Sequence, residues 1–358
     1  MVAYIEELSV KRHKWLDEER FKDGVALCQT IPGATAMQTA AYVGLRSNGI
    51  PGALSSFVGF GLPAFILMLF LSSIYAKYHS VPRLISLFNG LQIAVIAIVA
   101  NATYSFGKTT FKNYRDIVIA VTASVLFRAG ISPFLVIMGA ALAGIIFFRN
   151  KTIVLTENAR EKDVYNFKRL SALLSVPILA LFVLYLVDIK FFNIAALMMR
   201  IDLFAFGGGF ASLPLMLHEI VDVRGWMDNT TFMDGIALGQ VTPGPIVITS
   251  TFIGYMLYGL PGAIAATLAV FTPSFLMVIA VTPVFDRLKT SAYFSGATKG
   301  ILASFVGLLF FVTVKFALAV PWNIVSLVLV FAAFVALLRK VDILYVVLIT
   351  AVISLFTF

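Results

Sequence analysis

Apolar segments long enough to cross a membrane recur along this whole chain, and they limit its fold more than any other feature. A helix rises about 1.5 Å per residue, so roughly 20 residues cover the hydrocarbon core of a bilayer. With 60% hydrophobic and only 13% charged residues, the chain has too little polar surface for a soluble domain of this size. The sequence therefore predicts an all-α polytopic membrane protein with about twelve transmembrane helices. The candidate segments are 21–45, 51–76, 84–106, 114–128, 132–148, 170–187, 191–210, 232–257, 262–284, 296–317, 322–338 and 341–357.

Charge and motifs narrow the function. The net charge is +9, but Lys and Arg gather between the apolar segments, which indicates cytoplasmic loops and no nucleic-acid binding. The single cysteine, Cys28, excludes an intramolecular disulfide. The sequence has no phosphate-binding loop, no GxSxG nucleophile motif and no HExxH pattern, and its three histidines are isolated. We therefore expect no cofactor, no metal site and no enzymatic activity.

The two halves of the chain repeat each other. WLDEERFKDGVALCQTIPGA, beginning at Trp15, matches WMDNTTFMDGIALGQVTPGP, beginning at Trp226, with ten identities in nineteen positions at an offset of 211. The match continues at an offset of 210, and upstream of it YIEELSV (4–10) resembles LHEIVDV (217–223). In each copy an aspartate, Asp17 or Asp228, stands at a predicted N-cap between the two apolar residues of a hydrophobic staple.

The repeat predicts three parts: a first transporter repeat (1–148), a charged linker with an extra helix (149–190) and a second repeat (191–358). A complete repeat has six segments, so with the extra helix equivalent positions lie seven segments apart. This odd number predicts that the second repeat is inverted relative to the first, as is typical of secondary transporters. The Lys and Arg residues of 149–169 place that loop in the cytoplasm.

The first repeat lacks one piece of the second. A glycine-rich segment containing FGGGF (206–210) precedes Trp226, whereas only fourteen residues precede Trp15. Either the first repeat has no such helix, or the chain starts upstream of Met1, which is the interpretation we prefer.

A Pro-Gly pair interrupts an apolar segment at the same place in each repeat. A proline in mid-helix removes a hydrogen bond, and in lipid the freed groups need protein or a polar cavity around them. Where the helix restarts, its first amides are unpaired and its dipole is positive, so an anion is the natural partner. The alternative is structural, because small and hydroxylated residues hold membrane helices together and prolines kink them. The predicted binding residues are Gln29, Thr30, Pro32, Gly33, Thr35, Gln38, Gly207, Gly208, Gly209, Gln240, Thr242, Pro243, Gly244, Pro245 and Thr249.

Other features keep two interpretations each. FGGGF is either a close-packing surface or a further break that lines the site. Asp23 and Asp234 are either acids at helix starts or groups that handle protons. Arg200 and Lys299 either compensate the charge of a bound anion or extend from apolar segments toward the membrane surface.

Five motifs together resemble the chromate ion transporter family in its long, two-domain form. They are FAFGGGFASLP, RGWMDNTTFMDGIALGQVTPGP and GLPGAIAATLAVFTPSF in the second half, and KWLDEERFKDGVALCQTIPGA and GIPGALSSFVGFGLPAF in the first half. The resemblance implies efflux of chromate, with sulfate as a competing dianion, driven by the membrane potential or by proton coupling. It also implies that the family's glycine-rich motif falls on Phe206 to Gly209, and its Q-x-x-P-G motif on Gln29, Pro32 and Gly33 and on their repeat mates. The first repeat departs from the family pattern, since it has no glycine-rich helix and reads PGA instead of PGP.

The function that we expect is export of an oxyanion, chromate first, by a multi-pass secondary transporter of the inner membrane. The anion would bind near the midplane between the two broken-helix motifs, with the lipid bilayer around the protein. The alternatives are transport of another anion, such as sulfate, and a non-transporting membrane partner subunit. The sequence leaves a homodimer open.

Overall fold

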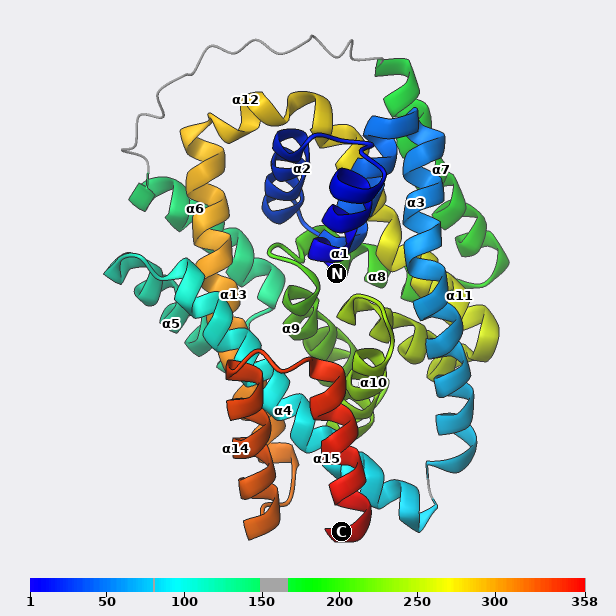
Figure 1. The fold of residues 1–358 in the computed structure, drawn as a ribbon, viewed down its shortest axis with the longest axis vertical. Helices are drawn as coiled ribbons and strands as arrows, with labels where there is room; N and C mark the ends of the chain where they lie inside the picture. The colour runs from blue at the N-terminus through cyan, green and yellow to red at the C-terminus, as the bar shows by residue number, and fades with distance from the viewer. Residues whose placement is uncertain (80, 149–166, 358) are drawn as a thin grey trace.

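The computed structural model describes residues 1–79, 81–148 and 167–357, which form helices and connecting loops without a β-sheet (Figure 1). Four of the described helices are long and apolar enough to cross a membrane: Thr35–Tyr78, Leu84–Thr110, Ile246–Lys289 and Ala292–Ala319. Shorter apolar helices accompany them near the positions expected from the sequence. The all-α polytopic fold is thereby confirmed, while the charged stretch 149–166 lies outside the described residues.

The described elements follow the order of the sequence repeat. The first half contains α1 (Val2–Glu6), the π-helix η1 (Glu7–Arg12), α2 (Glu18–Thr30), α3 (Thr35–Tyr78), α4 (Pro82–Thr110), α5 (Tyr114–Arg128) and α6 (Pro133–Phe148). The extra helix is α7 (Phe167–Val187). The second half contains α8 (Ile189–Phe204), η2 (Gly209–Ala211), α9 (Ser212–Met216), the π-helix η3 (Leu217–Val223), α10 (Asn229–Val241), η4 (Ile246–Ile248), α11 (Thr249–Val281), η5 (Thr282–Val284), α12 (Phe285–Lys289), α13 (Ala292–Ala319), α14 (Ile324–Leu338) and α15 (Ile343–Thr357).

The predicted helix starts are confirmed in both repeats. An Oδ1 atom of Asp17 accepts a hydrogen bond from the Arg20 amide at 2.7 Å, and Asp228 accepts the equivalent bond from the Thr231 amide at 2.7 Å. These bonds satisfy one unpaired amide at the start of α2 and one at the start of α10. Phe21, at N4 of the first staple, is buried as expected.

The predicted alignment of YIEELSV with LHEIVDV, upstream of the N-caps, is shifted by two residues from the alignment that the structure shows. The amide of Trp15 bonds to the carbonyl of Ser9 at 2.7 Å, and the amide of Trp226 bonds to that of Ile220 at 2.8 Å. Donor and acceptor residues of the second bond are both numbered 211 higher than those of the first. Aligning YIEELSV with LHEIVDV requires an offset of 213 residues instead. The reason is that apolar residues without special backbone geometry fix a register poorly, while the π-helices that end both segments fix it well.

Each Pro-Gly break reverses the direction of the chain. A Cβ placed on Gly24 of α2 would collide with the ring of Tyr42 in α3, and one on Gly235 of α10 would collide with Phe252 in α11. In each pair the two residues lie at nearly equal distances along the chain before and after the Pro-Gly break. Contacts of this kind are those of a helical hairpin. A helix as short as α2 or α10, with 13 residues, spans about 20 Å and cannot cross the membrane alone. The expected segments 21–45 and 232–257 are therefore re-entrant hairpins.

A second reversal follows at a glycine within α3 and within α11. Gly49 has φ +62° and ψ −153°, and Gly259 has φ +63° and ψ −150°, a conformation that is essentially restricted to glycine. Each turn separates a short limb (35–47 or 249–257) from a long limb (50–78 or 260–281). The limbs pack closely enough that a Cβ on Gly44 would collide with the carbonyl of Gly52.

The terminal hairpins are exchanged between the repeats. Helix α13 packs along α5 and α6 of the first repeat, while α4 packs along α14 and α15 of the second. Gly300 on α13 lies against Gly144, and their repeat mates, Gly90 and Ser354, lie against each other in the same way. In Figure 1, α4 rises toward α5 while α13 descends toward α14, so the two equivalent helices run in opposite directions.

Candidate anion site

Three interruptions of the helical backbone meet inside the protein. Two are the Pro-Gly tips of the re-entrant hairpins, at 31–34 and 242–245. The third is the glycine-rich loop 205–208, where α8 ends at Phe204 before η2 begins. A Cβ on Gly208 would lie 3.3 Å from Oγ1 of Thr35 at the first tip, and one on Gly209 would lie 2.9 Å from the side chain of Ile246 at the second. The loop is therefore a break that lies between the tips.

The first tip is held by backbone bonds and by one serine. Pro32 and Phe206 form an isolated antiparallel bridge, and the amide of Gly33 bonds to the carbonyl of Ala205 at 2.9 Å. The amide of Ala34 donates to Oγ of Ser274 at 3.0 Å. Gly33 has φ +118°, so this bend also depends on glycine. The glycine-rich loop and α11 thus fix the point at which α3 begins.

Free amides remain at the starts of the helices that follow the tips. The N–H groups of Thr35, Ala36 and Met37 make no hydrogen bond within the described residues, as expected for the first turn of a helix. At the second tip the same holds for Ile246 and Val247, the first residues of η4. Such groups carry a partial positive charge, and a helix N-terminus binds anions through them.

The two tips are seated in equivalent ways on the opposite repeat. A Cβ on Gly33 would collide with Ser274 of α11, and a Cβ on Gly244, its repeat mate, would collide with Ala64 of α3. Ala64 and Ser274 are themselves related by the offset of 210. The pseudo-symmetry therefore extends to the site, but only the first tip receives a hydroxyl.

Several of the predicted hydroxyl groups bond to the backbone of their own tip. Thr30 donates to the carbonyl of Leu27, Thr242 to that of Gly239 and Thr249 to that of Ile246, each at 2.8 Å. The hydroxyl of Thr35 lies 3.4 Å from the carbonyl of Cys28. These residues stabilise the ends of the short helices, so their first role is structural.

The predicted glutamines and prolines differ in exposure. Gln38 is fully buried and donates through Nε2 to the carbonyl of Pro32 at 2.5 Å. Gln29 and Pro243 are exposed, and Gln240 is half-buried. The second tip is therefore open at Pro243, whereas residues 31–34 of the first tip are all buried and its exposed neighbour is Gln29. Pro245 is buried beside η4.

The four ionisable candidates do not meet at the tips. Asp234 is buried on α10, where Oδ2 accepts from the Tyr75 hydroxyl at 2.9 Å and Oδ1 accepts from the Gln92 amide at 2.8 Å. Its repeat mate, Asp23, is half-buried on α2. Arg200 is exposed, with a nitrogen 3.8 Å from a Glu219 oxygen and its guanidinium 3.9 Å from the centre of the Phe134 ring. Lys299 is exposed on α13, with Nζ 5.8 Å from the centre of the Phe148 ring.

The structure adds an acid that sequence reasoning did not place at the site. Asp202, on the last turn of α8, is fully buried and its Oδ2 accepts from the amide of Ser274 at 2.8 Å and from its hydroxyl at 2.7 Å. One sequence signal was available, because an aspartate inside an apolar segment is costly and therefore informative. Its partner is 72 residues away, however, and no motif connects the two.

Comparison with known proteins identifies the family. The family model described as chromate transporter matches residues 1–145 and 192–355, which is most of the chain and includes all three interruptions. The chain belongs to the chromate transporter family. Membership makes it a multi-pass membrane transporter and not an enzyme, and it confirms the resemblance of the repeated motifs.

Relatives span most of this transporter. An uncharacterized transporter of Methanocaldococcus jannaschii is 44% identical over 356 residues, covering 99% of this chain and 88% of its own. The chromate transport protein of Cupriavidus metallidurans is 26% identical over 340 residues, covering 92% of this chain and 82% of its own. A probable chromate transport protein of Synechococcus elongatus is 27% identical over 316 residues, covering 86% and 78%. No solved structure matches the transporter.

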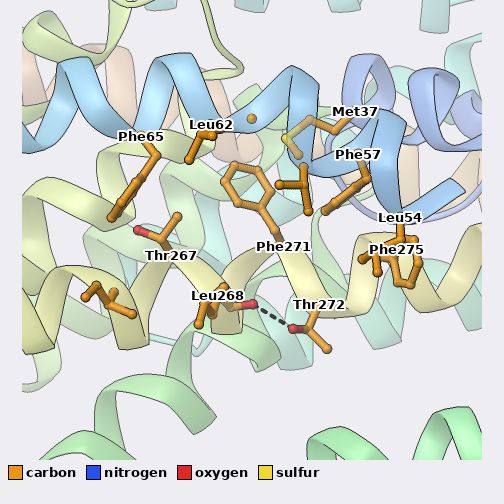
Figure 2. A pocket seen from close by; sticks show the side chains of 13 residues that line it. Met37, Leu54, Phe57, Leu62, Phe65, Thr267, Leu268, Phe271, Thr272 and Phe275 are labelled. Carbon is orange, nitrogen blue, oxygen red and sulfur yellow. Dashed lines mark hydrogen bonds between the residues drawn. The ribbon is translucent and has the colours of Figure 1, made fainter. Parts of the chain in front are cut away.

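A cavity of about 440 Å³ adjoins the first tip of the transporter, between the long limbs of α3 and α11 (Figure 2). Figure 2 shows Met37, from the first turn of α3, among lining side chains that are mainly Phe and Leu. Its threonines, Thr267 and Thr272, bond to helix carbonyls or to another threonine. The apolar lining does not suit an oxyanion. The backbone amides of the tips suit an anion better than this cavity does.

Proposed function

We propose that the transporter exports an oxyanion, chromate first, from the cell across the inner membrane, and that the anion binds at the free amides of the two hairpin tips. The convergence of both tips on the glycine-rich loop carries this proposal. It brings two helix N-termini from oppositely directed repeats to one region, and positive helix ends at the midplane are how broken-helix transporters bind anionic groups. Relatives named chromate transport proteins support the choice of anion.

The membrane potential suffices as a driving force for export in this proposal. Moving one charge across 100 mV involves about 2.3 kcal/mol, so a dianion leaving an inside-negative cell gains about 4.6 kcal/mol. No nucleotide is required, which agrees with the lack of a phosphate-binding loop in the sequence. Sulfate has the same charge and tetrahedral shape, so it is the first competitor to consider.

The test is uptake of labelled chromate into inside-out vesicles energised by a membrane potential. Replacing Gln240 by Ala removes a half-buried amide beside the second tip without touching its backbone. Loss of one hydrogen bond to a charged ligand costs about 1.5–3 kcal/mol, so the apparent affinity should fall about tenfold or more. Gly244→Ala should lower uptake further, because its methyl group would collide with Ala64.

Gly139→Ala serves as the matched control, because a methyl group there meets open space. It should transport like the parent protein at equal abundance in the membrane. Normal chromate affinity and uptake in both Gln240→Ala and Gly244→Ala would overturn the assignment of the site. Sulfate in excess should compete if the site recognises tetrahedral dianions in general. Uptake of sulfate but not of chromate would replace the proposed substrate and leave the site unchanged.

A further inference from the structure

A buried polar cluster joins α8, α11 and the first tip. Oδ2 of Asp202 receives two hydrogen bonds from Ser274, and Oγ of Ser274 in turn accepts from the amide of Ala34. The other carboxyl oxygen, Oδ1, is buried and has no hydrogen-bond partner among the described residues. The Asp202 carboxyl group is thus connected to the start of α3 through Ser274 by two consecutive hydrogen bonds, and its Oδ1 atom takes no part in them.

No cation in the described part of the chain neutralises this carboxyl group. On its own helix, Lys190 is exposed, and Arg200 lies against Glu219 and the Phe134 ring. The titratable side chains of α11 are Tyr255 and Tyr258, neither of which is a cation, and α9 has none. On α3 both Arg46 and Lys77 are exposed, Tyr185 of α7 is exposed, and Cys28 of α2 is a buried free cysteine. An unpaired buried charge is strongly unfavourable in a membrane protein.

A second buried oxygen without a partner belongs to the same cluster. Gln38 is fully buried, and its Oε1 has no hydrogen-bond partner within the described residues. Its Nε2 lies 2.6 Å from a Cβ built on Gly33, and the side chain of Ser274 also approaches that position closely. Both unpartnered oxygens are acceptors, so the group that completes the cluster is a donor or a cation.

The number of free oxygens distinguishes a proton from a metal ion. Ca²⁺ takes about six to eight oxygen ligands and Mg²⁺ about six, and the cluster offers two that are unpartnered. A proton on Asp202 needs no further ligand, removes the buried charge and supplies a hydroxyl donor. Asp234 differs, because both of its oxygens accept hydrogen bonds already.

We propose that Asp202 is a proton-binding site linked to the anion site, such that the anion binds at the first tip when Asp202 is protonated. This linkage rests on the proposed function. A carboxylate joined to the amide of Ala34 through one serine repels a dianion at the adjacent amides, and protonation removes that repulsion. By thermodynamic reciprocity, the bound anion also favours the proton. Ala64 stands where the second tip would need a serine, so only the first tip has this linkage.

The experiment measures binding of labelled chromate and sulfate to the purified full chain between about pH 5.5 and about pH 8.5. The dissociation constant of the parent protein should rise with pH, by up to about tenfold per unit once Asp202 is ionised. Asp202→Asn should bind sulfate, which stays a dianion over this whole range, with a pH-independent constant, because an amide oxygen still accepts both bonds from Ser274 and cannot ionise. Chromate gains a proton near neutral pH, so for chromate the difference in pH dependence between the parent and Asp202→Asn is compared. Asp188→Asn, the matched control at the N-cap of α8, should behave like the parent.

Five outcomes test the proposal and the function on which it rests. A pH dependence in Asp202→Asn equal to that of the parent overturns it, and so does binding that depends on sodium and not on pH. Ser274→Ala keeps the carboxyl group, so its pH dependence should survive with a shifted midpoint, which keeps the test valid if Asp202→Asn is unstable. Infrared spectra of the anion-free protein should show a carboxylic acid band at acid pH that Asp202→Asn lacks; its absence in the parent overturns proton binding. If the parent binds neither anion at any pH, the proposed function fails, while the infrared result still decides whether Asp202 binds a proton.

Discussion

Thr103 and Thr313 contact each other across the centre of the molecule, with 3.2 Å between their hydroxyl oxygens. The two residues are 210 positions apart, which is the offset of the repeat in this part of the chain. A residue that touches its own equivalent must lie on the symmetry axis that relates the two halves. The pseudo-twofold axis therefore passes between α4 and α13 at these threonines.

The axis contact predicts a specific cross-link. In a chain with Cys28 replaced by Ser, the pair Thr103→Cys and Thr313→Cys should form an intramolecular disulfide on mild oxidation, because the two side chains already touch. A protease site placed within 149–166 would reveal it, since the cleaved halves would migrate together on a gel until reduced. Either cysteine alone is the control. Separation of the oxidised double variant into halves would contradict the position of the axis.

The turn within α11 predicts a cost due to backbone strain alone. Gly259→Ala should destabilise the protein by about 1–3 kcal/mol, because alanine disfavours φ +63° with ψ −150°. A methyl group at Gly259 meets no atom within 4 Å, so no collision contributes. Gly49→Ala should behave alike. Thermal unfolding in detergent measures the effect, and Gly59→Ala, in open space on a regular helix, should cause no loss.

The exchanged hairpins predict a cost due to close packing. Gly300→Ala should destabilise by about 1–3 kcal/mol, because the methyl group would collide with the carbonyl of Ala140 and could be accommodated only by moving α13 away from α6. Gly139 lies on α6 beside Ala140, but a methyl group there faces open space, so Gly139→Ala should leave the unfolding temperature unchanged. Equal unfolding temperatures for the two variants would contradict the observed packing.

The bonds to Asp234 predict a structural effect and a separate functional one. Tyr75→Phe removes the hydroxyl that donates to Oδ2 and should cost about 1–3 kcal/mol of stability, because a buried acceptor loses its partner. If Asp234 only connects α10 to α3 and α4, Asp234→Asn should still transport at a normal rate when its abundance is matched. Loss of transport in Asp234→Asn at full stability would instead assign the residue to proton handling.

Local features of this fold were predictable from the sequence, and contacts between distant residues were not. The caps at Asp17 and Asp228 and the burial of Phe21 depend on residues within one helical turn, so their spacing sufficed. The break at Pro32 and Gly33 was also visible. Whether it kinks or reverses the chain depends on the fit of Gly24 against Tyr42, which no local pattern encodes.

The site was predicted in part for the same reason. Both tips were expected to line the candidate site, and the glycine-rich loop was expected either to line it or to pack closely, since prolines and glycines mark where a backbone leaves the helix. Asp202 was not expected at the candidate site, because only its hydrogen bonds from Ser274 connect it to the first tip. Those bonds form only when α8 and α11 are packed together. The roles of the hydroxyl groups of Thr30, Thr242 and Thr249 also became visible only once their carbonyl acceptors had positions.

The exchange of terminal hairpins has a consequence for the order in which the protein is made. The partners of α4 are α14 and α15, which come last in the sequence, so α4 emerges from the ribosome long before the surface on which it will rest. Chains are synthesised from the N-terminus at about 5–20 residues per second, so this helix waits in the membrane for many seconds with one side facing only lipid. The first half is therefore expected to complete its packing only after α14 and α15 have been synthesised.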